Sequence, residues 1–136
     1  MKKSLNLAAT VALLQDIAEL RQEHVLCLSL DSGQGLIAKR TVFMGTLTSV
    51  IAHPREIFAD PIVDRAAAII VAHNHPSGDV SPSRQDISLT QQLIASGLIL
   101  GIPLSDHIIV ARKKYFSFRE EGLMDSDIYI AEEGSA

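Results

Sequence analysis

The sequence is poor in cysteine and in aromatic residues. It has one cysteine, no tryptophan, two tyrosines and four phenylalanines. A lone cysteine can form neither an internal disulfide nor a cage of several thiolates around a metal ion. Cys27 lies within an apolar stretch, so a buried thiol is expected. The few aromatic rings offer little material for a platform on which nucleic-acid bases could stack.

The chain also lacks a long hydrophobic run and an excess of basic residues. No segment reaches the roughly 18 consecutive apolar residues that span a membrane. Two lysines precede an apolar N-terminal stretch, but Asn6, Thr10 and Gln15 interrupt it and no small-residue cleavage site follows, which predicts a helix of a cytoplasmic protein rather than a signal peptide. The 12 basic and 16 acidic residues give a net charge of −4, which argues against direct nucleic-acid binding.

What remains is the composition of one globular domain, with 136 residues of which 47% are apolar and 21% are charged. Hydrophobic periodicity predicts an amphipathic helix over 5–22, capped by Ser4, and further helices over 53–64 and 83–99. Pro61 should end or kink the helix over 53–64, and Gly101 should cap the helix over 83–99. Strands are predicted at 23–30, 36–45, 66–72, 104–111 and 115–118, with a loop over 73–82.

The predicted strands and helices are intermixed, with no internal repeat and no linker. The first two strands flank a cluster of turn-forming residues, which predicts an antiparallel hairpin. The run over 66–72 is continuously apolar, as expected of a strand buried on both faces. A single mixed α/β domain is therefore the predicted fold class.

The stretch from His73 to Asp86 carries the pattern with the clearest chemistry. His73 and His75 stand at positions i and i+2 at the end of an extended segment, so their imidazoles project to the same side. Asp86 can supply a third ligand if the intervening loop folds back beside the strand end. Two nitrogens and one carboxylate oxygen, without a thiolate, are typical of a catalytic zinc site that keeps one position open for water.

Each part of this pattern also has a structural interpretation. The tetrapeptide from Ser83 to Asp86 is a helix start in which the serine hydroxyl caps a backbone N–H group. An isolated H-x-H pair is a weak signal. The combination of a buried strand, an H-x-H pair, a loop with proline and glycine, and a capped helix with an acid in its first turn favours the metal site.

The spacing of His73, His75, Ser83 and Asp86 resembles the metal motif of the JAB/MPN (JAMM) metallohydrolases. The amino-acid sequences of segments 53–56, 73–78 and 106–110 resemble those of the RadC branch of that family. The resemblance covers residues 23–123, with an N-terminal helix over 1–22 before them and a polar, acidic tail over 124–136 after them. It implies a single mixed-sheet α/β domain of the JAB/MPN type, similar to cytidine deaminases, with flanking helices.

The resemblance also implies Zn²⁺ held by His73, His75 and Asp86, and a zinc-bound water that attacks an amide carbonyl of a protein or peptide substrate. Glu23, at the start of the first core strand, matches the glutamate that the family uses as general base. Its structural alternative is a solvated residue at a helix end, and Glu56 is a rival for the role. Ser83 would donate a hydrogen bond to the oxyanion in addition to capping its helix.

A second function stays open beside this zinc metallopeptidase. The naming of the RadC branch implies a DNA-repair or replication-associated interaction module that keeps the metal site without peptidase turnover. Full-length RadC proteins carry a helix-hairpin-helix segment before this domain, where this sequence has only a short segment, which argues against direct DNA binding. An exposed edge strand over 36–45 could mediate formation of a homodimer or addition of a peptide strand.

Three further polar residues have expected places relative to the metal motif. His24 should face away from Glu23, because side chains alternate along a strand. Asn74 should point away from the metal and tie down the loop, and His107 should be a hydrogen-bonded core or supporting histidine rather than a ligand.

Overall fold

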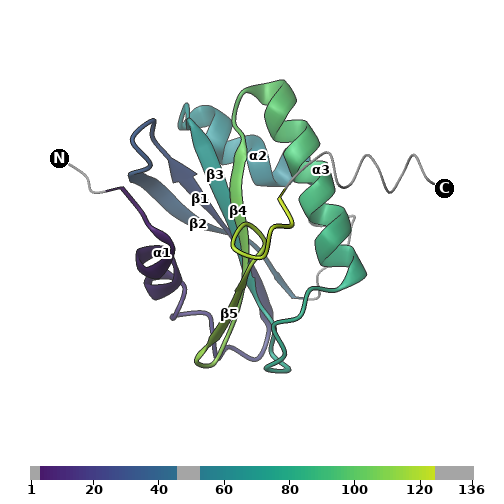
Figure 1. Cartoon of the computed structure of the whole chain (residues 1–136). Helices are drawn as coiled ribbons and strands as arrows, with labels where there is room; N and C mark the ends of the chain where they lie inside the picture. The colour runs from purple at the N-terminus through teal and green to yellow at the C-terminus, as the bar shows by residue number, and fades with distance from the viewer. Residues whose placement is uncertain (1–3, 46–52, 125–136) are drawn as a thin grey trace.

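The computed structural model describes residues 4–45 and 53–124, which form one five-stranded sheet with helices on both faces (Figure 1). The strand order is β2-β1-β3-β4-β5, with β3 and β4 parallel and the other neighbours antiparallel. The predicted mixed α/β fold is confirmed. The elements are α1 (Leu7–Leu13), β1 (Glu23–Leu30), β2 (Leu36–Gly45), α2 (Pro54–Val63), β3 (Ala68–Asn74), α3 (Arg84–Leu100), β4 (Leu104–Ala111) and β5 (Lys114–Ser117).

The predicted hairpin of β1 and β2 is present, and β2 lies at one edge of the sheet. Its turn is held by Asp31, whose Oδ1 accepts hydrogen bonds from the backbone N–H groups of Gly33 (2.9 Å) and Gly35 (2.8 Å). An aspartate that accepts from the backbone a few residues ahead stabilises a tight turn. The turn residues recognised in the sequence therefore close the hairpin by this local bonding.

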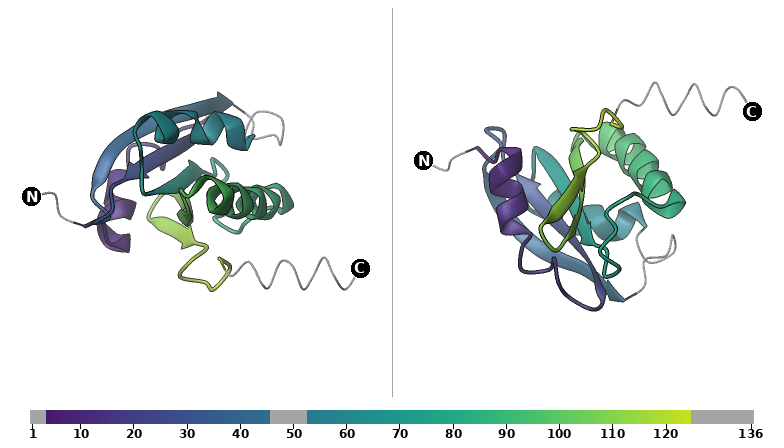
Figure 2. Two further views of the ribbon diagram at one scale, coloured as in Figure 1. Left: turned by 90° about the horizontal axis from the view of Figure 1, so that it is seen from above. Right: turned by 60° about the horizontal axis from the view of Figure 1, so that its bottom comes forward.

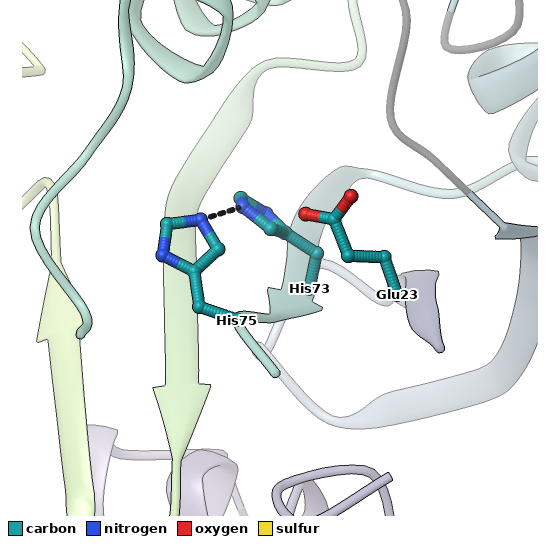
Figure 3. Close-up of side chains that lie close together, drawn as sticks. All are labelled: Glu23, His73 and His75. Atoms are coloured by element: carbon teal, nitrogen blue, oxygen red, sulfur yellow. Dashed lines mark hydrogen bonds between the residues drawn. The ribbon is translucent and has the colours of Figure 1, made fainter. Parts of the chain in front are cut away.

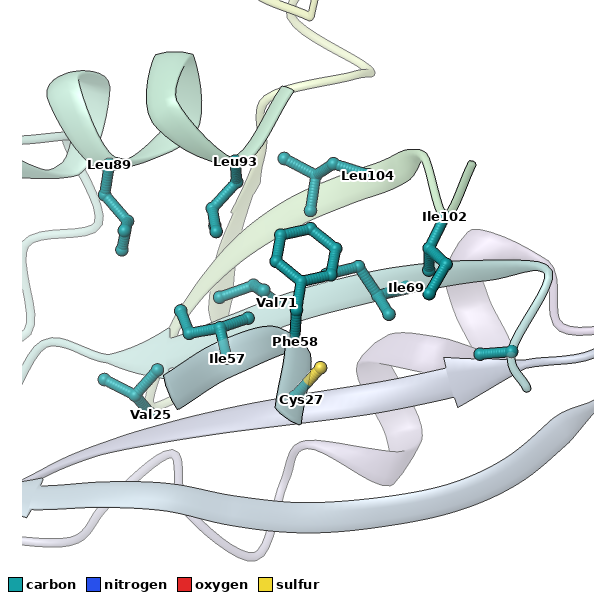
Figure 4. Packing of buried hydrophobic residues seen from close by; sticks show 11 residues of the cluster. Val25, Cys27, Ile57, Phe58, Ile69, Val71, Leu89, Leu93, Ile102 and Leu104 are labelled. Carbon is teal, nitrogen blue, oxygen red and sulfur yellow. The ribbon is translucent and has the colours of Figure 1, made fainter. Parts of the chain in front are cut away.

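The two faces of the sheet bury two separate apolar clusters. Helices α2 and α3 cover one face, and α1 with the segment after it covers the other (Figure 2). Alternation along β1 turns Val25 and Cys27 toward α2 and α3 (Figure 4). It turns Leu26 into the cluster on the α1 side. Cys27 is buried as predicted, and burial raises the pKa of its thiol to about 12.

The N-terminal helix is shorter than the predicted span of 5–22. Helix α1 covers Leu7–Leu13, and its N-cap is Asn6, whose side chain accepts from the backbone N–H of Ala9 (2.8 Å). The predicted cap, Ser4, instead donates its hydroxyl proton to the backbone carbonyl of Gly33. After α1 the chain continues in turns with backbone bonds from residue i to i−3. These turns still bury Leu14, Ile17 and Ala18 against the sheet, so the apolar spacing did not require a continuous helix.

Two other boundaries also differ from the sequence prediction. Pro61 does not end α2 at its own position, because the helix runs to Val63 and the backbone N–H of Asp64 bonds to the carbonyl of Asp60 (2.8 Å). Strand β3 begins at Ala68 and continues through His73 and Asn74, which were predicted to lie in a loop. Pairing with β1 on one side and β4 on the other extends the strand to Asn74. Strand β5 is shifted by one residue from the predicted 115–118.

Helix α3 follows its predicted limits closely. Ser83 is the N-cap and Gly101 is the C-cap, with a φ of 74° that glycine adopts at no steric cost. Within the helix, a Cβ atom on Gly97 would lie 2.6 Å from the carbonyl oxygen of Ile102. Only glycine allows the end of α3 to approach the start of β4 this closely. At its other end, the first turn of α3 lies beside the carboxyl end of β3.

None of the helices in residues 4–45 and 53–124 is both long and apolar enough to cross a membrane. The predicted acidic tail over 124–136 lies outside the described residues except for Met124.

Candidate metal centre

Two imidazoles meet at the carboxyl end of β3. His73 is the penultimate residue of the strand and is fully buried, and His75 follows the strand with its backbone N–H bonded to the carbonyl of Val110 (3.0 Å). Their Nε2 atoms lie 3.0 Å apart (Figure 3). The i and i+2 spacing therefore turns both rings to the same side, as predicted.

Asp86 brings a carboxylate to the same point from the first turn of α3. Its Oδ1 lies 3.0 Å from the Nε2 of His73, and its Oδ2 lies 3.1 Å from the Nε2 of His75. Three donor atoms around one tetrahedral zinc ion, each about 2.0 Å from it, would be about 3.3 Å apart. The two imidazoles and the carboxylate are thus spaced as ligands of one small cation would be.

The carboxylate of Asp86 is held by a capping box with Ser83. The backbone N–H of Ser83 donates to Oδ2 of Asp86 (2.8 Å), and the hydroxyl oxygen of Ser83 accepts from the backbone N–H of Asp86 (3.1 Å). The structural role of this Ser-x-x-Asp sequence is therefore confirmed. It coexists with the convergence on the histidines, because Oδ1 of Asp86 is buried and makes no hydrogen bond.

Glu23 lies on the open side of this centre. Glu23, His73 and His75 each offer a ligand-type atom within 4.8 Å of the others, and Figure 3 shows the Glu23 side chain directed toward the ring of His73. Glu23 also lines an open groove of about 320 Å³ together with Ser83 and Asp86. The structure thus brings the predicted general base to the predicted ligands.

The rival base, Glu56, is not part of this group. It lies in the first turn of α2 with 58% of its side chain exposed, and its Oε1 is 3.6 Å from Nε of Arg55. The neighbouring His53 caps α2 through its ring, which accepts from the backbone N–H of Arg55 (3.1 Å). Segment 53–56 therefore begins helix α2, and its side chains do not contribute to the centre that Glu23 borders.

Asn74 faces away from the two histidines, as predicted, and fixes the chain before β1. Its Oδ1 accepts from the backbone N–H of His24 (2.6 Å), and its Nδ2 donates to the carbonyls of Leu20 (3.1 Å) and Gln22 (3.0 Å). The ring of His24 bonds to the Gln22 carbonyl (2.9 Å) and takes no part in the centre. Asn74 therefore anchors the residues on both sides of Glu23.

His107 supports the centre from inside the core, as predicted. It is fully buried on β4, and its Nε2 lies 2.9 Å from Nδ1 of His73. Its Nδ1 lies 2.6 Å from the hydroxyl of Thr90, a residue that the sequence analysis did not single out. The available signal was the position of Thr90 four residues after Asp86, on the same face of a helix. Burial lowers the pKa of His107 well below its ordinary value, so this ring is neutral.

The electrostatics keep the carboxylate of Asp86 charged. Burial alone would favour its neutral form, but the adjacent rings of His73 and His75 outweigh burial and hold the pKa of Asp86 well below its usual range. The same carboxylate raises the pKa of His75. A buried anion that remains ionised beside two imidazole nitrogens is suited to binding a divalent cation.

Comparison with known proteins shows relatives across most of the chain. Residues 4–123 match the family of RadC-like JAB domains. A UPF0758 protein of Bacillus licheniformis is 49% identical over 112 residues, which make up 82% of this chain and 50% of the relative. The UPF0758 protein YsxA of Bacillus subtilis is 46% identical over 111 residues, 82% of this chain and 48% of the relative. The chain spans about half the length of the curated relatives it matches.

Proposed function

The chain belongs to the RadC-like JAB domain family, and on that premise we propose that it is a zinc-dependent hydrolase of the metallopeptidase or isopeptidase type. One observation carries the proposal. The Nε2 atoms of His73 and His75 converge with the carboxylate of Asp86, whose buried Oδ1 has no hydrogen bond. Such an oxygen is costly to bury unless another partner, here a cation, satisfies it.

The donor set fits zinc better than a hard cation. Two imidazole nitrogens and one carboxylate oxygen, with no thiolate, are typical of catalytic zinc sites, whereas calcium and magnesium favour sites built of oxygen ligands. When bound, zinc would lower the pKa of a coordinated water and polarise a substrate carbonyl. His73 on β3, His75 directly after β3 and Asp86 on α3 would hold it.

Glu23 would move the proton in this reaction. Its carboxylate borders the groove beside the two histidines, where it can take a proton from the attacking water and return it to the leaving amine. Asn74 holds the backbone next to Glu23 and so limits where its side chain can reach. The exposed Glu56 has no such position.

Ser83 would stabilise the oxyanion that forms on the substrate. Its hydroxyl oxygen already accepts from the backbone N–H of Asp86, which leaves the hydroxyl proton to be donated into the groove that Ser83 lines. A donor aimed at developing negative charge lowers the barrier for attack on a carbonyl.

An extended protein or peptide segment suits the surface around this centre. The groove of about 320 Å³ beside Glu23 and Ser83 lies on one side of His75 and Pro76. A second open hollow of about 280 Å³, lined by Leu20 and other residues, also borders His75 and Pro76. A substrate chain could therefore lie across the loop after β3 and contact both hollows.

Metal analysis of protein purified without a histidine tag tests the centre directly. We expect stoichiometric zinc in the wild-type protein and its loss in the His73→Ala and His75→Ala variants. His53→Ala is the matched control, because it removes a histidine that caps α2 and should leave the zinc content unchanged. Zinc well below stoichiometry, with no further loss on changing His73, would reject the proposal.

Hydrolysis of a fluorescence-quenched peptide library tests the activity. We expect zinc-dependent cleavage by the wild-type protein, loss of cleavage with retained zinc in Glu23→Gln, and near-wild-type cleavage in Glu56→Gln. Zinc binding without any cleavage would contradict the peptidase proposal for these probes and favour the interaction module that keeps its metal.

A further inference from the structure

A continuous chain of hydrogen bonds runs through the core behind the candidate metal centre. It leads from the ring of His73 on β3 to His107 on β4 (2.9 Å), then to the hydroxyl of Thr90 on α3 (2.6 Å), and ends at the backbone carbonyl of Asp86 (2.9 Å). All four residues are fully buried. Two of the proposed ligands, His73 and Asp86, are thus joined through His107 and Thr90, which are not themselves proposed as metal ligands.

The chemistry of these groups sets the direction of the chain. A backbone carbonyl can only accept, so the single hydroxyl proton of Thr90 is donated to the carbonyl of Asp86. The Thr90 oxygen must then accept from Nδ1–H of His107. A ring with a single proton that donates from Nδ1 can only accept at Nε2, so Nε2 of His107 accepts from Nδ1–H of His73 (2.9 Å).

The same reasoning applies to His75 by a shorter route. Its Nδ1 lies 2.7 Å from the backbone carbonyl of Asp79, which can only accept, so Nδ1 of His75 carries a proton and donates it. Both histidines of the motif then direct their Nε2 atoms toward one another and toward the carboxylate of Asp86.

We propose that His107 and Thr90 are positioning residues that fix His73 as its Nδ1–H tautomer and keep the Nε2 lone pair of His73 directed to the metal centre. Residues that orient metal-bound histidines in this manner strengthen metal binding by about 10- to 100-fold. Here the orienting group is a third histidine, which is anchored through Thr90 on α3. This inference rests on the proposed metal centre, and it assigns roles to two residues outside the ligand set.

The first measurement locates the protons in metal-free protein. Long-range ¹H–¹⁵N NMR spectra of protein labelled in histidine distinguish a proton on Nδ1 from one on Nε2. We expect Nδ1–H on His73 and on His107 in the wild-type protein, and an altered tautomer mixture for His73 in His107→Phe. Protons on Nε2 of both rings in the wild-type protein would overturn the inference, because the chain would then run in the opposite direction.

The second measurement compares zinc affinities by competition with a chromophoric chelator. Thr90→Val removes the hydroxyl at nearly constant shape, whereas Thr90→Ser keeps it. His107→Phe preserves the parallel stacking on Phe118, whose ring centroid lies 4.7 Å away, while His107→Gln retains an acceptor for His73. We expect about 10- to 100-fold weaker binding for the valine and phenylalanine variants, and affinities closer to wild type for the serine and glutamine variants.

Equal zinc affinity in Thr90→Val and Thr90→Ser would contradict the positioning role even if His107→Phe failed to fold. Failure of the proposed function gives a different result. In that case the wild-type protein would bind no zinc, whereas the NMR measurement on the metal-free protein would still decide the tautomer of His73.

Discussion

Asp86 and Asp106 are two buried carboxylates with opposite surroundings. Asp106 on β4 is 6% exposed, and both of its oxygens accept hydrogen bonds, Oδ1 from the backbone N–H groups of His107 (2.7 Å) and Arg119 (3.0 Å), and Oδ2 from the hydroxyl of Ser117 (2.6 Å). Asp86 is fully buried, yet its Oδ1 has no hydrogen bond and lies 3.0 Å from a ring nitrogen of His73.

The two carboxylates are both buried, so the chemistry of the neighbouring groups, and not burial, distinguishes the candidate ligand from the structural carboxylate. Both oxygens of Asp106 accept hydrogen bonds from protein donors, which tie β4 to β5 and to the chain after it. Asp86 instead faces the Nε2 atoms of both histidines, a set of atoms that could bind one cation. The pKa values also diverge, because burial raises the pKa of Asp106, whereas the two histidines hold that of Asp86 well below its usual range.

The largest expected effect is on metal binding when the Asp86 carboxylate is removed. Asp86→Ala should weaken zinc binding by more than about 100-fold, since changes in merely supporting residues already cost about 10- to 100-fold. Asp106→Asn is the matched control and should bind zinc like the wild-type protein. Chelator competition measures both affinities. Equal losses in the two variants would remove the distinction between a ligating and a structural carboxylate.

The next largest effect is on the free energy of unfolding when the Asp106 carboxylate is removed. Asp106→Ala should lower the free energy of unfolding of the metal-free protein by about 3–5 kcal/mol, because it leaves buried donors without an acceptor. Asp86→Ala should cost the metal-free protein only about 0.5–2 kcal/mol, as expected for a damaged helix cap. Urea denaturation of both variants in the presence of a chelator gives the two values. A larger loss for Asp86→Ala would reverse the comparison.

A smaller effect concerns the pH dependence of stability. The raised pKa of Asp106 means that the folded protein binds this proton more tightly than the unfolded chain does. As pH rises above the ordinary carboxyl pKa of about 3.9, the unfolded chain ionises first and the stability contributed by the protonated Asp106 is lost. The stability of the wild-type protein relative to Asp106→Asn should therefore be lower at neutral pH than near the ordinary carboxyl pKa. Chelator-treated samples isolate this dependence, and a difference that grows with pH would show that the pKa is lowered.

The smallest expected effect separates the two roles of Ser83. Ser83→Ala should destabilise α3 by about 1 kcal/mol, and Ser83→Gly by only a few tenths, because glycine is itself a tolerated cap. Both variants remove the hydroxyl proton, so both should reduce peptide cleavage to a similar extent, while Ser83→Thr keeps activity. Thermal unfolding and the cleavage assay measure the two effects. Activity that followed stability across the three variants would leave Ser83 with its capping role alone.

Much of the fold could be predicted because its determinants are local. The limits of β4, the hairpin turn and both caps of α3 depend on residues close together in the sequence. The errors arose where distant contacts decide. Leu14 and Ile17 are buried by turns and not by a longer helix, and His73 belongs to a strand because β1 and β4 pair with it.

The candidate site divides in the same way. The sequence spacing, together with the family resemblance, identified His73, His75 and Asp86, and the structure brings them together. The choice between Glu23 and Glu56 could not be made from sequence, since both are glutamates next to a recognisable motif. The position of Glu23 depends on Asn74, whose side chain holds a backbone group 50 residues earlier in the chain.

By itself, the sequence determined the donor set of the centre and the fold class that carries it. Alternation along a strand puts His73 and His75 on one side, and the Ser-x-x-Asp cap places a carboxylate at a helix start. Only the tertiary structure decided that Oδ1 of Asp86 would lack a hydrogen bond, and that His107, 34 residues from His73, would orient its ring. The reason is physical, because strand alternation and helix capping act over a few residues, whereas hydrogen-bond satisfaction in the core depends on which elements pack together.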